Sequence, residues 1–274
     1  MAGDTQFAVG IIGVGNMGAA LVRGIIEKGT MTAESVIVCD LDRDLVSRVC
    51  KDLGVVDGTE ATHVARSADL VILAAKPQNL HSLLRQISPS INANQTIMSI
   101  AAGVTTHSIE KGLGGQPSVI RVMPNLPAVV GEGISVICGG SYATEPDFER
   151  VERVLNAVGV CIKAKEQMMN PVTALSGTGP AYVFHTMEAM IRSGIDMGMS
   201  PEMAERLVIH TVFGAAMLAM KSDLDPTSLR EAVTSRGGTT DAAISHLEEN
   251  GYSRLVVEAI LAAMDRSEEL GRGS

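Results

Sequence analysis

Hydrophobic and polar residues alternate in two patterns over the first 165 positions of the chain. Short apolar, β-branched runs are typical of buried strands, and the longer amphipathic segments between them are typical of helices. Such strands alternating with helices predict βαβ units and a mostly parallel sheet. We expect strands at Phe7–Ile12, Val36–Asp40, Leu70–Ala74, Thr96–Ile100, Val119–Met123, Gly133–Cys138 and Val160–Ala164, and helices at Ala19–Glu27, Leu45–Leu53, His81–Ile87 and Phe148–Val158.

The pattern changes near residue 165, where the strand signals end. Ser200 before Pro201 and Asp225 before Pro226 combine a capping side chain with proline at the first helical position. The sequence therefore predicts an α/β domain over residues 1–165 and an all-α domain over residues 166–274. The helices expected there are Met168–Ala174, Pro180–Met197, Pro201–Met220, Pro226–Val233, Thr239–Glu249 and Arg254–Leu270.

Composition narrows the class of protein. Hydrophobic residues make up 46% of the 274 positions, yet tryptophan is absent and aromatic residues are only 3%. The core must therefore consist of Ala, Val, Ile, Leu and Met, and the 15 methionines fit this as flexible core fillers. A methionine-lined ligand surface is the alternative. The net charge of −9 without a basic cluster argues against a nucleic-acid partner.

Cysteine and histidine spacing bears on compartment and metal content. Cys39, Cys50, Cys138 and Cys161 form no CxxC pair, which is typical of reduced thiols in a cytoplasmic protein. The six histidines show no HxxxH spacing, so we expect no metal site. The first residues include Asp4 and no basic segment, and we expect neither a signal peptide nor a membrane span.

A glycine-rich motif, GVGNMG at Gly13–Gly18, follows the first expected strand and opens a helix. In a G-x-G-x-x-G turn the first glycine permits the bend, and the second lets backbone approach a diphosphate. The third lets helix and strand pack closely. The diphosphate would lie at the helix N-terminus, where unpaired N–H groups favour negative charge. A glycine turn without a ligand is the alternative.

Asp40 lies 22 residues after Gly18, at the end of the second expected strand. A carboxylate there hydrogen-bonds a ribose 2′-hydroxyl and repels a 2′-phosphate, which favours NADH over NADPH. Arg43 could still accept such a phosphate, and an ordinary strand-end cap is the alternative for Asp40.

Two other strand ends carry small residues, AAKP at Ala74–Pro77 and IAAG at Ile100–Gly103. Ligands of open α/β sheets lie outside the carboxyl ends of strands, so these segments are candidates for contact with the cofactor. Lys76 would face the cofactor or solvent. In the turn MPNLP, Asn125 would either aim its carboxamide at the nicotinamide or belong to a plain turn.

The stretch TSRGGTT, Thr234–Thr240, precedes the helix expected at Thr239–Glu249. Gly237 and Gly238 let backbone N–H groups approach a bound anion, and the hydroxyls of Ser235, Thr239 and Thr240 add donors. Capping of the helix by these residues is the alternative. The residues alone leave the two interpretations open.

The motifs GVGNMG, AAKP, IAAGV, RVMPNLPAVV, ALSGTGPAYVF and VTSRGGTT occur in this order and closely resemble pyrroline-5-carboxylate reductases over residues 7–270. The resemblance implies a Rossmann domain and a helical domain that interlocks in a homodimer, which in some members assembles into a homodecamer. It implies hydride transfer from NADPH or NADH to the C=N carbon of Δ1-pyrroline-5-carboxylate, giving L-proline.

The resemblance also implies residue roles. Substrate contacts would be Ser235, Gly238, Thr239 and Thr240, to which the glycine argument adds Gly237. Because a threonine is a poor acid, Thr240 would hydrogen-bond the ring nitrogen of a substrate already bound as the iminium. Cofactor contacts would be Ile12, Gly13, Val14, Gly15, Asn16, Met17, Asp40, Ala74, Ala75, Lys76, Pro77, Ile100, Ala101 and Ala102, with Asn125 as the further candidate named above.

This chain departs from the family pattern at three positions. Leu126 stands where a threonine is usual, Arg236 replaces a proline, and Asp40 stands where NADPH-using relatives often carry Ser or Thr. The first two bear on the geometry of substrate binding and the third on the choice of cofactor.

Two rival functions share the expected layout. A β-hydroxyacid dehydrogenase of the 6-phosphogluconate dehydrogenase type uses a lysine on the first long helix of its second domain, but residues 166–220 contain no lysine. A non-catalytic NAD(P)-binding module would not need the GGTT segment at 237–240.

Overall fold

The structure is a computed structural model that describes residues 6–272, so Asp4 and its neighbours lie outside it. Contacts divide the chain into two compact units. One holds residues up to Thr178 together with those from Ala263 onward, and the other is Gly179–Ala262. The domain division predicted at residue 165 follows a different criterion, the change from strands to helices, and stays a prediction.

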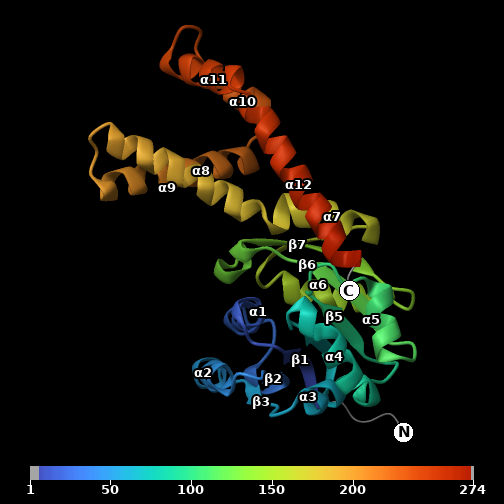
Figure 1. The fold of residues 1–274 in the computed structure, drawn as a ribbon. Helices are drawn as coiled ribbons and strands as arrows, with labels where there is room; N and C mark the ends of the chain where they lie inside the picture. Colours follow the sequence, from blue (N-terminus) through green and yellow to red (C-terminus); the bar gives the residue numbers. More distant parts are fainter. Residues whose placement is uncertain (1–5, 273–274) are drawn as a thin grey trace. The chain divides into compact units, whose positions relative to one another are not determined.

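Within residues 6–272 the first unit is built on a sheet of eight strands in the order β3-β2-β1-β4-β5-β6-β7-β8 (Figure 1). Every neighbouring pair is parallel except β6 and β7, which confirms the predicted mostly parallel sheet. The strands are β1 (Phe7–Ile12), β2 (Val36–Cys39), β3 (Val56–Asp57), β4 (Ala68–Leu73), β5 (Thr96–Ser99), β6 (Ser118–Met123), β7 (Gly133–Gly139) and β8 (Gly159–Lys163).

Helices cover both faces of this sheet (Figure 1). One apolar core lies under α1 (Asn16–Glu27), α2 (Arg43–Leu53) and α6 (Glu145–Leu155). The other lies under α3 (Ala61–Ser67), α4 (Pro77–Ile87) and α5 (Thr106–Leu113). Both cores are aliphatic, as the composition requires. Short 3₁₀ turns occur at η1 (Ala33–Ser35), η2 (Ser88–Ser90), η3 (Leu126–Val130) and η4 (Glu166–Met168).

Several elements differ from the expectation. The sequence patterns missed β3, α3 and α5, which are short and carry few apolar residues. Helix α6 begins before Phe148 because Thr144 and Asp147 form a reciprocal capping box. The helix expected at Met168–Ala174 is confirmed as an α-helix only over α7 (Met169–Val172). It is preceded by η4 and followed by a π-helical turn, η5 (Thr173–Gly177).

The second unit is helical. It contains α8 (Gly179–Asp196), α9 (Pro201–Lys221), α10 (Pro226–Ala232), α11 (Thr239–Glu249) and the first part of α12 (Tyr252–Arg272). The predicted caps are confirmed, because Ser200 accepts a hydrogen bond from the Met203 N–H and Asp225 accepts one from the Ser228 N–H.

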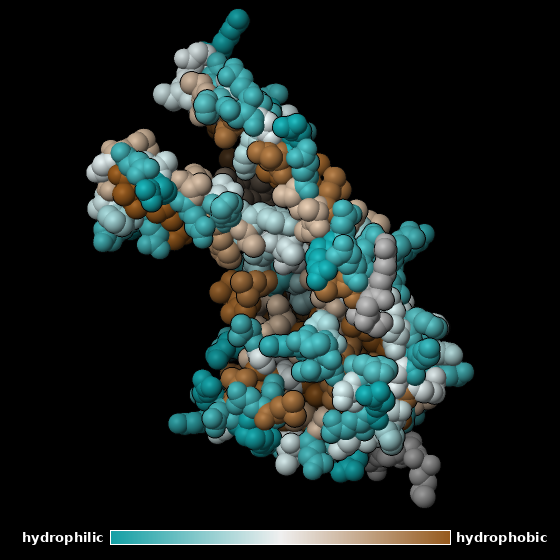
Figure 2. Space-filling view, viewed as in Figure 1, coloured by the Kyte–Doolittle hydropathy of each residue, from teal (hydrophilic) through white to brown (hydrophobic). Residues whose placement is uncertain are grey.

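The helices of the second unit expose many large apolar side chains (Figure 2). Helix α9 is long and apolar enough to cross a membrane, judged by its length and composition alone. Only 11% of its most apolar 18-residue stretch is buried. Apolar surface of this extent marks a face that another molecule covers. On α9 the exposed side chains include Leu207, Ile209, Phe213, Leu218 and Met220.

Candidate active site

The glycine turn between β1 and α1 has the geometry that its motif predicts. Gly13 has a φ of +105°, which glycine adopts without strain. A β-carbon on Gly18 would lie 2.0 Å from the Gly13 carbonyl oxygen, whereas one on Gly15 would have nothing within 4 Å. Packing therefore requires glycine at position 18, the third glycine of the motif. Gly15, the second, leaves open space beside the N-terminus of α1.

The other candidate cofactor segments lie at the same edge of the sheet. The Gly13 N–H donates to the Cys39 carbonyl at 2.8 Å, and the Ala74 N–H donates to the Ile12 carbonyl at 2.9 Å. The Ile100 N–H donates to the Leu73 carbonyl at 3.2 Å. These bonds hold the carboxyl ends of β1, β2, β4 and β5 together. Ile12–Met17, Ala74–Pro77 and Ile100–Ala102 thus share one edge, where a dinucleotide would bind.

Asp40 directly follows β2 and faces the glycine turn. One carboxylate oxygen accepts the Val14 N–H at 2.7 Å, and the other accepts the Asp42 N–H at 3.0 Å. A carboxylate has about four acceptor positions, so a ribose hydroxyl can still donate to it. Burial, with a smaller contribution from the Asp40 charge, raises the pKa of the Cys39 thiol to about 12. That thiol stays protonated near neutral pH and is a poor nucleophile.

The structure gives Arg43, the alternative phosphate ligand, a protein partner. Its Nη2 pairs with the Asp57 carboxylate, and its Nη1 donates to the Thr59 carbonyl at 3.3 Å. Sequence reasoning missed Asp57. The segment VVDGT offered a signal, because a β-branched pair that ends in Asp-Gly is typical of a short strand and turn.

Asn125 lies at the carboxyl end of β6 and contacts two other segments of the first unit. Its Oδ1 accepts the Ile134 N–H at 2.9 Å, and its Nδ2 lies 3.5 Å from the Ser176 hydroxyl. A β-carbon on Gly177 would lie 2.3 Å from the Met123 methyl group. The MPNLP and SGTG motifs therefore pack together. A contact between Asn125 and a nicotinamide stays a prediction.

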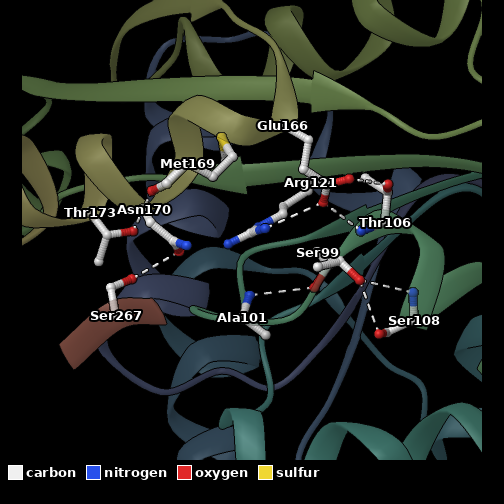
Figure 3. A network of polar contacts seen from close by, with 11 residues as sticks. Ser99, Ala101, Thr106, Ser108, Arg121, Glu166, Met169, Asn170, Thr173 and Ser267 are labelled. Carbon is white, nitrogen blue, oxygen red and sulfur yellow. Dashed lines mark hydrogen bonds and ion pairs between the residues drawn. The ribbon is translucent and has the colours of Figure 1, made fainter. Parts of the chain in front are cut away.

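A partly buried ion pair, between buried Arg121 and half-buried Glu166, supports the loop between β5 and α5 (Figure 3). Glu166 accepts hydrogen bonds from the Thr106 N–H and hydroxyl, both at 2.7 Å, and lies 3.3 Å from Nη1 of Arg121. Glu166 thus holds the N-terminus of α5, which ends the loop that begins at Ile100. Sequence reasoning missed this network, although an arginine inside the apolar run VIRVM signals a buried partner.

In the second unit, Thr234–Thr240 leads into α11 with an open helix N-terminus. Gly238 is the N-cap residue of α11, and no side chain makes a capping hydrogen bond there. Gly237, one position earlier, has a φ of +73°. Among the described residues, no hydrogen bond involves the hydroxyls of Ser235, Thr239 or Thr240. The Gly237 N–H donates to the Asp241 carboxylate at 2.8 Å. The unused N–H groups of the first turn and the nearby hydroxyls are the donors that an anion requires.

In the part of the chain that the structure describes, no group of three or more His, Cys, Asp or Glu side chains could hold a metal ion.

A glycine turn at the carboxyl edge of a doubly wound, mostly parallel sheet, followed by a helical region, is the arrangement typical of nicotinamide-dinucleotide-dependent oxidoreductases. In agreement, residues 8–103 match the family model described as "NADP oxidoreductase coenzyme F420-dependent". Residues 166–270 match the model described as "Pyrroline-5-carboxylate reductase dimerisation".

Relatives cover nearly the whole chain. A pyrroline-5-carboxylate reductase of Methanosarcina acetivorans is 38% identical over 96% of this chain and 98% of its own. One from Arabidopsis thaliana is 36% identical over 97% of this chain and 96% of its own. The chain therefore belongs to the pyrroline-5-carboxylate reductase family and is an oxidoreductase that uses NAD(P)H.

Solved structures agree with this assignment. A pyrroline-5-carboxylate reductase from Coxiella burnetii superimposes with a TM-score of 0.90 at 33% identity, covering 97% of this chain and 98% of its own. A pyrroline carboxylate reductase from Plasmodium falciparum, solved with NADP bound, has a TM-score of 0.88 at 30% identity and covers 98% of this chain and 100% of its own. The dimerisation match indicates that chains associate through the C-terminal helical region.

Proposed function

We propose that this enzyme reduces the C=N bond of Δ1-pyrroline-5-carboxylate to L-proline, the last step of proline biosynthesis. The observation that carries the proposal is the uncapped N-terminus of α11, where the hydroxyls of Ser235, Thr239 and Thr240 have no hydrogen-bond partner among residues 6–272. The substrate is a small ring with one carboxylate and one imine nitrogen. An uncapped helix N-terminus suits that carboxylate because its N–H groups are already unpaired.

Bound NAD(P)H supplies the hydride that the imine carbon accepts. Gly13, Gly15 and the N-terminus of α1 would hold the diphosphate, while Ala74–Pro77 and Ile100–Ala102 would lie along the ribose and nicotinamide. The carboxylate of Asp40 would accept a ribose hydroxyl. Because Arg43, the cation three residues after Asp40, is paired with the Asp57 carboxylate, we propose that NADH is preferred to NADPH.

Substrate residues would act by orientation. The backbone N–H groups of Thr239 and Thr240, with the hydroxyls of Ser235 and Thr239, would hold the carboxylate, since the Gly237 and Gly238 N–H groups already donate to Asp241 and to the Ser235 carbonyl. The Thr240 hydroxyl would hydrogen-bond the ring nitrogen, directly or through water. A threonine is too weak an acid to protonate an imine, so the substrate would enter as the iminium. The protein then contributes alignment for hydride transfer and exclusion of water.

We also propose that the enzyme is a cytoplasmic homodimer, with a homodecamer as the larger assembly. The exposed apolar side chains of α9 would then be covered by helices of the second copy instead of by a lipid bilayer. Size-exclusion chromatography with light scattering in detergent-free buffer measures the assembly directly. A monomer that elutes only with detergent would contradict this proposal.

The test of the reaction is NADH or NADPH oxidation, at matched concentrations, with pyrroline-5-carboxylate as substrate. We expect nicotinamide absorbance to fall and L-proline to accumulate in equal amount by chiral amino-acid analysis. Oxidation of a β-hydroxy acid with NAD⁺ in place of this reaction would support the dehydrogenase alternative. Cofactor binding without turnover of either substrate would support the non-catalytic alternative.

A further inference from the structure

The end of strand β2 carries a cation that the fold holds in a fixed place. Arg43 is the first residue of α2, three positions after Asp40. Its guanidinium pairs with Asp57 through Nη2 and donates to the Thr59 carbonyl through Nη1 at 3.3 Å. Both charged side chains are about half exposed, at 49% for Arg43 and 40% for Asp57. The pair therefore lies at the rim of the edge where the cofactor would bind.

The turn after β3 is shaped around this arginine. Strand β3 pairs with β2 so that Asp57 lies beside Val38, which brings its carboxylate to the carboxyl end of β2. Asp57 Oδ1 accepts the Thr59 N–H at 2.8 Å. Thr59 has a φ of +63°, and among residues 6–272 it is the only residue other than glycine with a positive φ.

A left-handed conformation is costly for a β-branched residue and needs a compensating interaction. Here that conformation presents the Thr59 carbonyl to Arg43, while the Thr59 N–H donates to Asp57. The turn thus holds both members of the ion pair. Although partial burial raises the pKa of Asp57, hydrogen bonds from Thr59 and Arg43 outweigh it and leave that pKa below its ordinary value.

The charged side chains at this edge would affect the binding of NADH and NADPH differently. Asp57 pairs with the guanidinium of Arg43, and Asp40 adds a second carboxylate three residues earlier, at the end of β2. A ribose 2′-hydroxyl is neutral and can donate to Asp40, which keeps acceptor capacity beyond its two backbone hydrogen bonds. A 2′-phosphate would face the Asp40 charge and would need a cation without another partner.

We propose that Asp57 is a specificity-determining residue, because it engages Arg43 in an ion pair and so withholds that cation from the 2′-phosphate of NADPH. Asp40 would exclude the phosphate directly, and Asp57 would act through Arg43. This inference rests on the proposed assignment of the Asp40 edge to the adenosine ribose. It extends the NADH preference to a residue outside the glycine turn and the end of β2.

The test compares full-length wild type, Asp57→Asn, Arg43→Leu and the double variant. For Asp57→Asn we expect kcat/KM with NADPH to rise about tenfold, the scale of one charge-assisted hydrogen bond. With NADH the value should stay within about twofold of the wild type. In the Arg43→Leu background, Asp57→Asn should leave NADPH kinetics unchanged. Asp57→Glu keeps the charge and should keep the wild-type cofactor ratio.

Two outcomes would overturn the proposal. A fall in NADPH efficiency in Asp57→Asn would mean that Asp57 orients Arg43 toward the phosphate. An equal gain in the Arg43→Leu background would mean that the effect is only one of net charge. Titration of nicotinamide fluorescence gives Kd for both cofactors without substrate. It therefore tests the proposal even if pyrroline-5-carboxylate is not the substrate. If Asp57→Asn does not fold, Asp57→Ser replaces it, because Ser removes the charge but keeps an oxygen that can accept the Thr59 N–H.

Discussion

The backbone N–H of Val14 donates a 2.7 Å hydrogen bond to the carboxylate of Asp40, joining the glycine turn after β1 to the end of β2. One residue therefore has two tasks. Its charge would face the ribose in the proposed cofactor site, and its oxygen accepts a hydrogen bond from the loop that would hold the diphosphate. A substitution that removes the charge but keeps an oxygen separates these tasks.

Asp40→Asn is expected to reduce the preference for NADH. The amide oxygen can still accept the Val14 N–H, but the negative charge that repels a 2′-phosphate is gone. We expect the ratio of kcat/KM for NADPH to that for NADH to rise about tenfold in steady-state assays. Asp44→Asn is the matched control, since it removes the same charge from the exposed first turn of α2. An equal shift in both variants would mean that the effect comes only from the change in net charge.

Gly15→Ala and Gly18→Ala are expected to fail in different ways. A β-carbon at Gly15 meets nothing within 4 Å in the protein, so stability should hold while the diphosphate is obstructed. A β-carbon at Gly18 would lie 2.0 Å from the Gly13 carbonyl oxygen, so the turn itself must deform. We expect raised cofactor Kd with a wild-type Tm for Gly15→Ala, and a lowered Tm for Gly18→Ala. Calorimetry and cofactor titration check this, and a matching loss of Tm in both would contradict it.

These glycines also show how far sequence reasoning reaches. A motif within one turn, such as Gly13–Gly18, contains its own geometry, so its place on the sheet was predictable. The roles of Asp57 and Glu166 were not predictable from the sequence. Their partners, Arg43 and Arg121, are distant along the chain and come close only because strands pair or the chain folds back on itself. Short elements such as α3 were not predicted for a related reason. Their stability comes from packing on the sheet and not from a periodic pattern in their own sequence.

Thr240→Ala is expected to lower kcat/KM for pyrroline-5-carboxylate at least about tenfold, because the ring nitrogen would lose its hydrogen-bond partner. The Kd for NADH or NADPH should stay close to that of the wild type. Thr227→Ala removes the same group from an exposed site on α10 and serves as the control. Wild-type kinetics in Thr240→Ala would exclude the proposed role.

Arg236 is expected to attract the anionic substrate without touching it. It is exposed and lies beside the open N-terminus of α11. We expect Arg236→Gln to raise KM for pyrroline-5-carboxylate about two- to threefold at low ionic strength, and the difference to vanish in high salt, since salt screens exposed charges. The usual family residue can be tested with Arg236→Pro. A KM that is unchanged at both salt concentrations would show that this charge has no effect.

Asp147 is expected to make the first unit sensitive to acid. Burial raises its pKa, but hydrogen bonds from Thr144 and Thr96 outweigh this and hold the pKa below the ordinary value of 3.8. The native state therefore binds the proton less readily than the unfolded chain. The stabilisation is complete above the unfolded pKa and is lost as pH falls through the lower native value.

Urea unfolding of wild type and Asp147→Asn at neutral pH and below about pH 4 measures this contribution. We expect the variant to be less stable at neutral pH, because an amide cannot accept from the α6 cap and from Thr96 as a carboxylate does. On acidification the wild type should lose more free energy of unfolding than the variant, so the two should converge. Asp52→Asn, at an exposed position of α2, should follow the wild type throughout. Parallel pH profiles for wild type and Asp147→Asn would mean that other carboxylates dominate acid unfolding.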